Sequence, residues 1–155
     1  MSAFEWLEGT RLALWVGESL WGYPLLLSLH IIGLAIVAGI FLMLDLLILG
    51  LAGGVKYATF RDLFPLAWSG LALNAVSGLA LFSSQAATFI VSVPFLVKIA
   101  CIAAGVVLAV LLRRRLQVLV DRRDGAGAAA PRLLAVLSLF AWIGAIIAGR
   151  LIAYF

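Results

Sequence analysis

The sequence predicts an all-α integral membrane protein, a four-helix bundle with a short N-terminal amphipathic helix at the membrane interface. Of the 155 residues, 66% are hydrophobic and only 12% are charged, which is too apolar for a soluble domain. Four apolar stretches are each long enough to cross a bilayer, since a helix rises about 1.5 Å per residue. The length suits one transmembrane domain over residues 1–155.

Residues 2–19 are too polar to span a membrane and too aromatic for a solvated tail. Their charged side chains are Glu5, Glu8, Arg11 and Glu18. Trp6 and Trp15 lie among these charges and Trp21 follows them, so we expect a short helix lying in the interface, with a frayed polar tail as the alternative. No basic region precedes an apolar core here, so we expect the first span, and not a cleavable signal peptide, to direct insertion.

The four spans are expected at about 20–51, 65–84, 94–112 and 131–154. The last three each begin at a proline, which suits the first turn of a helix. Gly53-Gly54 is expected to end the first span, and the arginines at 113–115 to end the third. The longest connector, 116–130, then joins the third and fourth spans.

The basic side chains indicate the orientation of the chain. Most Lys and Arg residues lie in or beside the first and third connectors, and few lie on the other side. Because cytoplasmic loops carry the excess of Lys and Arg, both termini are expected in the periplasm of a bacterial inner membrane. The formal net charge of +4 is therefore interpreted as a topology signal, and no nucleic-acid partner is expected.

The first span contains the only histidine of the chain, His30. Ionisable groups inside a span are costly, and they are candidates for function by default. Gly33 follows three positions later on the same helical face, where we expect it to leave room for a flat ligand.

Each of the other spans places polar groups at a similar depth, in the outer half of the membrane. These are Asn74 and Ser77 on the second span, Lys98 on the third and Arg150 on the fourth. Two buried cations need an anionic partner, and a ligand with carboxylates around a metal held by His30 has the profile of haem b.

For the same residues, purely structural roles are the alternative. His30 could form only a hydrogen bond between helices, and the side chains of Lys98 and Arg150 could reach out to the interface. Asp45, near the inner end of the first span, could pair with Arg61 or the 113–115 run, or could relay protons.

Several other chemistries lack the residues they need. Zinc and copper sites require more His, Cys and carboxylate ligands than the spans contain. A single cysteine, Cys101, excludes an intrachain disulfide. No glycine-rich phosphate loop or serine–histidine pair of recognisable spacing is present.

The segments WGYPLLLSLHIIGLAIVAG, FRDLFPLAWSGLALNAVSGLALF and PFLVKIACIAAGVVLAVLL carry a family resemblance. They resemble a family of uncharacterised bacterial four-helix membrane proteins and, more distantly, the HemJ-type protoporphyrinogen oxidases and the CopD-type copper-resistance membrane domain. The HemJ-type likeness implies haem b at the first-span histidine, His30, and a functional role for the third-span lysine, Lys98. HemJ-type chains carry further histidines, and CopD-type chains further copper ligands, that this sequence lacks.

The leading hypothesis is a b-type haem-binding membrane protein that transfers electrons or belongs to a membrane oxidoreductase, with a redox partner or quinone. The alternatives are a cofactor-free structural or accessory subunit, and a small transporter or copper-handling protein. Pairs of small residues four apart, as in Ala35 and Gly39, together with the uncharged loop 85–93, also predict a homo-oligomer in the lipid bilayer.

Overall fold

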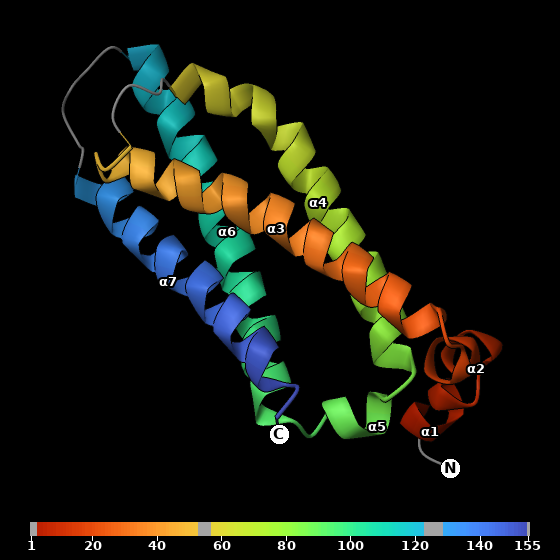
Figure 1. Cartoon of the computed structure of the whole chain (residues 1–155). Helices are drawn as coiled ribbons and strands as arrows, with labels where there is room; N and C mark the ends of the chain where they lie inside the picture. The colour runs from red at the N-terminus through yellow and green to blue at the C-terminus, as the bar shows by residue number, and fades with distance from the viewer. Residues whose placement is uncertain (1–2, 53–56, 123–128, 155) are drawn as a thin grey trace. The chain divides into compact units, whose positions relative to one another are not determined.

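The computed structural model of the chain describes residues 3–52, 57–122 and 129–154. Within these ranges it contains helices and no strand, which confirms the all-α class. The helices, shown in Figure 1, are α1 (Ala3–Glu8), α2 (Arg11–Glu18), α3 (Gly22–Ile48), α4 (Tyr57–Ser83), α5 (Ala86–Phe89), α6 (Val93–Arg122) and α7 (Ala129–Leu151).

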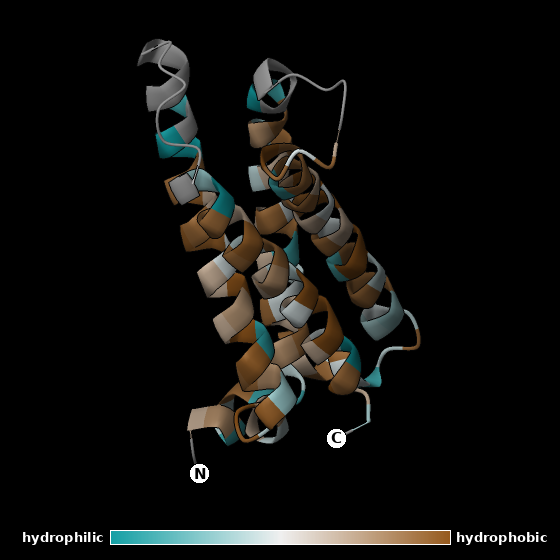
Figure 2. Cartoon of the chain, turned by 90° about the vertical axis from the view of Figure 1, so that its left-hand side faces the viewer, coloured by the Kyte–Doolittle hydropathy of each residue, from teal (hydrophilic) through white to brown (hydrophobic). Residues whose placement is uncertain are grey.

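Within the described residues, four helices are long and apolar enough to cross a membrane. Their apolar parts are Gly22–Ile48, Arg61–Ser83, Val93–Arg115 and Pro131–Leu151. They agree with the four predicted spans to within a few residues, and Figure 2 shows hydrophobic residues along most of their length. The prediction of a multi-pass membrane protein is therefore confirmed at the level of helix length and composition.

The chain divides into two compact units. The first consists of Met1–Gly39 with Phe64–Val93, and the second of Ile40–Leu63 with Pro94–Phe155. Helices α3 and α4 each contribute one end to each unit, so both units contain membrane-length helices. The expected single transmembrane domain over 1–155 stays a prediction.

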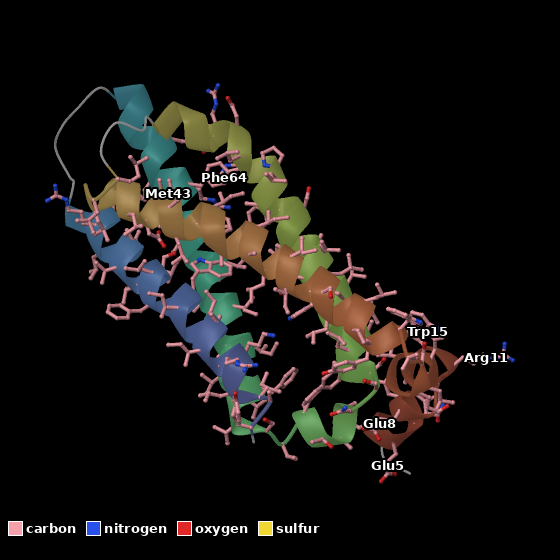
Figure 3. All side chains as sticks on the ribbon, viewed as in Figure 1. Glu5, Glu8, Arg11, Trp15, Met43 and Phe64 are labelled. Carbon is pink, nitrogen blue, oxygen red and sulfur yellow. The ribbon has the colours of Figure 1, made fainter. Side chains whose placement is uncertain are left out.

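The amphipathic N-terminal segment forms two short helices, α1 and α2, rather than one. The break falls at Gly9 and Thr10, where the Thr10 hydroxyl donates to the carbonyl of Leu7 and accepts from the amide of Ala13. Thr10 is thus the N-cap of α2. Figure 3 shows Arg11 and Trp15 on this helix, and the tryptophan is about half exposed.

A hydrogen bond that the sequence does not predict joins α1 to α5. The carboxylate of Glu8 accepts the amide N–H of Ala87 at 2.9 Å, in the first turn of α5. The side chain of Gln85, the residue before α5, makes no such capping bond. The first amides of a helix have no partner inside the helix. Glu8, although far from α5 in the sequence, therefore caps its N-terminus.

Helix α3 ends earlier than predicted, at Ile48, and the residue responsible is Gly50. Its φ of 81° is left-handed, and the amides of Gly50 and Leu51 donate to the carbonyls of Leu47 and Leu46. These two bonds form a Schellman motif, in which glycine avoids the steric cost of a side chain. The pair expected to end the helix, Gly53-Gly54, lies outside the described residues.

Two helices extend beyond the predicted spans. Helix α4 begins at Tyr57, so Pro65 lies inside it and not in its first turn as expected, although it stays near the start of the apolar part. Helix α6 continues through the arginines at 113–115 to Arg122, although its apolar, membrane-length part ends at Arg115, within a few residues of the predicted span. Arginine, leucine and glutamine favour helix, and neither glycine nor proline occurs between Gly105 and Gly125.

Replacing Gly50 by alanine is predicted to lower the free energy of unfolding by about 1–2 kcal/mol, the cost of a β-carbon in a left-handed conformation. The measurement is reversible unfolding in mixed detergent micelles. Gly50→Asn is the matched control and should cost less, because asparagine tolerates this conformation. Equal stability of wild type and Gly50→Ala would show that the motif does not contribute.

Candidate functional site

The imidazole of His30 lies between α3 and α4 in the first unit, with 9% of the residue exposed. Its Nδ1 is 3.0 Å from the backbone carbonyl oxygen of Asn74. Because a carbonyl oxygen only accepts, we assign the ring proton to Nδ1, which donates to it. The lone pair of the neutral imidazole is then on Nε2.

The side chain of Asn74 holds the same histidine from a second direction. Its Nδ2 donates to the backbone carbonyl of His30 at 2.9 Å and lies 3.4 Å from Nε2 of the ring. Ser77, one turn away, donates to the carbonyl of Leu73 at 2.6 Å, with its hydroxyl oxygen 3.4 Å from Nδ1 of His30. The structure thus brings together three of the predicted site residues, all buried.

Gly33 has a different role from the one expected. A β-carbon built on it would lie 2.7 Å from the backbone nitrogen of Asn74 and 2.8 Å from the carbonyl oxygen of Gly70. The space beside Gly33 is therefore filled by the backbone of α4, not left for a flat ligand. Gly78 likewise receives the histidine ring, since its β-carbon would lie 2.9 Å from Cε1 of His30. Glycine at these positions lets the two helices approach closely.

The two cations of the predicted site belong to the second unit. Lys98, on α6, lies against α7, where a β-carbon built on Gly149 would be 3.4 Å from its Cε. Arg150, the next residue, is exposed, and it donates to the hydroxyl of Tyr154 at 3.0 Å and lies over its ring. Lys98 and Arg150 thus lie near each other on α6 and α7, and their placement beside His30 stays a prediction.

A second group of polar side chains lies in the second unit. The carboxylate of Asp45 is buried, and neither of its oxygens has a hydrogen-bond partner among the described residues. Its expected partner, Arg61, instead lies 3.7 Å from the carboxylate of the adjacent Asp62. Pairing of Asp45 with Arg61 is therefore not observed.

A metal ion at His30 would need ligands from another source. Within the part of the chain that the structure describes, no three His, Cys, Asp or Glu side chains come together. The haem b expected from the sequence stays a prediction, and a porphyrin would itself supply most of the ligands of its iron.

Comparison with known proteins found no matching family model, no matching curated protein and no matching solved structure. The resemblance to HemJ-type and CopD-type proteins therefore stays a prediction.

Asp45 was not expected in the same helix contact as Ser138 and Trp142 of α7. Phe41 and Asp45 are one turn apart on α3, and Ser138 and Trp142 are one turn apart on α7. This shared spacing was the available signal, but it did not indicate which two helices would meet.

Replacing Gly33 by alanine is predicted to destabilise the protein by about 1–3 kcal/mol, because its methyl group would meet the backbone of α4. Gly39→Ala, on the same helix, is the matched control, since nothing lies within 4 Å of a β-carbon built there. We expect the control to be neutral or slightly stabilising. Thermal unfolding in detergent compares the two, and an equal effect of both would contradict the close helix contact.

Proposed function

We propose that the chain is an integral membrane protein that binds haem b through Nε2 of His30. It would act in electron transfer or as a component of a membrane oxidoreductase, with a redox partner or a quinone. The observation that supports this is the hydrogen bond from Nδ1 of His30 to the carbonyl of Asn74. Histidines that bind metals commonly donate their other ring N–H to a backbone carbonyl, which fixes the ring and its tautomer.

The residues of the first unit fit haem in part. Nε2 of His30, which carries the lone pair, would hold the iron, whereas Gly33 packs α3 against α4 and leaves no space for a ligand. In this proposal Asn74 and Ser77 hold the ring of His30, and the contact of Lys98 and Arg150 with the propionates stays a prediction from the sequence. Haem b, when bound, would supply a one-electron redox centre. The residues of the first unit would hold the iron and orient the imidazole.

A second candidate is a cofactor-free structural or accessory subunit of a membrane complex. It is favoured by the way Asn74 contacts both the backbone and the ring of His30. Polar side chains that satisfy each other across two helices stabilise membrane proteins by about 0.6 kcal/mol on average. In that case the cluster fastens α3 to α4 and carries out no chemistry.

We further propose a bacterial inner-membrane location with both termini periplasmic, and self-association into a homo-oligomer. The orientation rests on the Lys and Arg residues around the first and third connectors. Self-association is supported by Ala35 and Gly39, which are four residues apart and both exposed on α3. Small residues on such a face allow close approach of another helix.

The haem proposal predicts a Soret band in the protein purified from cells supplied with haem, and its loss in His30→Ala. Asn74→Ala is the matched control. It removes the amide but keeps the backbone carbonyl that accepts from Nδ1, so we expect the band to remain. Absorption spectra and haem-to-protein ratios of the three proteins provide the measurement.

The same samples separate the two candidates. Absence of the band in wild type, with a similar loss of thermal stability in His30→Ala and Asn74→Ala, would favour the cofactor-free subunit. An unchanged band in His30→Ala would remove His30 as the ligand and overturn the proposal.

The proposed orientation predicts a periplasmic C-terminus. A fusion of alkaline phosphatase after residue 155 should be active, because this reporter requires the periplasm, and a fluorescent protein that folds only in the cytoplasm should stay dark. A fusion in the predicted cytoplasmic connector, after Gly127, should give the opposite pair of signals. An inactive phosphatase with a bright fluorescent protein after residue 155, and the opposite pair after Gly127, would contradict the orientation.

A further inference from the structure

Three buried polar side chains of the second unit have no hydrogen-bond partner among the described residues. They are Asp45 on α3, with 1% of the residue exposed, and Ser138 and Trp142 on α7, both with 0% exposed. Burying a polar group without a partner costs free energy, so such groups are rare and call for an explanation.

The three side chains belong to one contact between α3 and α7. The rings of Phe41 and Trp142 are stacked, with centroids 5.5 Å apart and planes 15° apart. One turn along each helix the carboxylate of Asp45 faces the hydroxyl of Ser138, although neither makes a well-formed hydrogen bond. The indole also packs against α6, where a β-carbon built on Gly105 would lie 2.9 Å from Cε2 and 3.2 Å from Nε1 of Trp142.

Neither carboxylate oxygen of Asp45 accepts a hydrogen bond from a cationic side chain among the described residues. Arg61 pairs with Asp62, and Lys98 contacts Gly149, eleven residues or about 16 Å along α7 from Ser138. The other described ionisable side chains of this unit are Cys101, Arg113, Arg114, Arg115, Arg132, Arg150 and Tyr154. None of them is hydrogen-bonded to Asp45. An isolated buried carboxylate is far less stable than the neutral acid.

We propose that Asp45 is a proton-binding site within the membrane-spanning part of the chain, with the hydroxyl of Ser138 as its polar neighbour. Binding forms one O–H bond between a carboxylate oxygen and a proton taken from water, and release breaks the same bond. The acid so formed can donate to the Ser138 hydroxyl, so that Asp45 and Ser138 both gain a hydrogen-bond partner. This site is independent of the haem proposal.

A metal cation is a poorer ligand for this site than a proton. Calcium takes about six to eight oxygen ligands and magnesium about six. One carboxylate and one hydroxyl supply too few oxygens, and the indole N–H of Trp142 only donates. A carboxyl group that binds and releases protons inside a span is typical of proton-coupled membrane proteins.

The test is infrared spectroscopy of the purified protein in lipid at neutral pH. We expect a carbonyl stretching band of a protonated carboxylic acid, shifted in heavy water, in wild type. It should be lost in Asp45→Asn and kept in Asp62→Asn, the matched control for an exposed carboxylate. Ser138→Ala should move the band without removing it, since the acid loses its neighbour and keeps its proton.

A second measurement uses wild type alone, in case Asp45→Asn does not fold. Dicyclohexylcarbodiimide enters membranes and reacts with protonated carboxyl groups, so peptide mass spectrometry should find the adduct on Asp45 and not on Asp62. Labelling should fall as the pH is raised, because the reactive form is the acid. Absence of both the Asp45-dependent band and the adduct, or labelling of Asp45 that does not change with pH, would overturn the proposal.

Discussion

The polar contacts of the first unit depend on the close approach of α3 and α4 at Gly33 and Gly70. Because neither residue has a side chain, the two backbones can meet, and a β-carbon at either position would clash. This approach brings the carbonyl of Asn74 within 3.0 Å of the His30 ring. In lipid, water is not available to satisfy such groups, so the helix contact and the hydrogen bonds support each other.

In the second unit the helices meet through an apolar contact instead of through hydrogen bonds between polar groups. Its central contact is the stack of Phe41 on Trp142, which is apolar and needs no partner. Next to this stack, Asp45 and Ser138 are buried and neither side chain forms a hydrogen bond with a described residue. His30 thus lies in a group whose members hydrogen-bond to each other, whereas Asp45 and Ser138 can form a hydrogen bond once Asp45 takes up a proton. Unpartnered groups of this kind are where function is commonly found.

The two polar groups have complementary chemistry. A neutral imidazole with its lone pair on Nε2 is suited to a metal, and a buried acid is suited to a proton. An electron carrier that also binds protons would unite both proposals, yet each rests on its own residues. The N-terminal helices contribute to neither group. Instead, the hydrogen bond between Glu8 of α1 and the amide of Ala87 holds α1 against α5 within the first unit.

The sequence by itself determined the helical class and the four spans, because hydrophobicity and helix length are local properties. It also predicted that Asn74 and Ser77 would meet His30. It did not determine that Gly33 packs against α4 instead of making room for a ligand, nor that Gly50 ends α3. The grouping of Asp45 with Ser138 and Trp142 was decided only by the tertiary structure. Helical spacing shows which residues share a face, but packing selects the helix which that face meets.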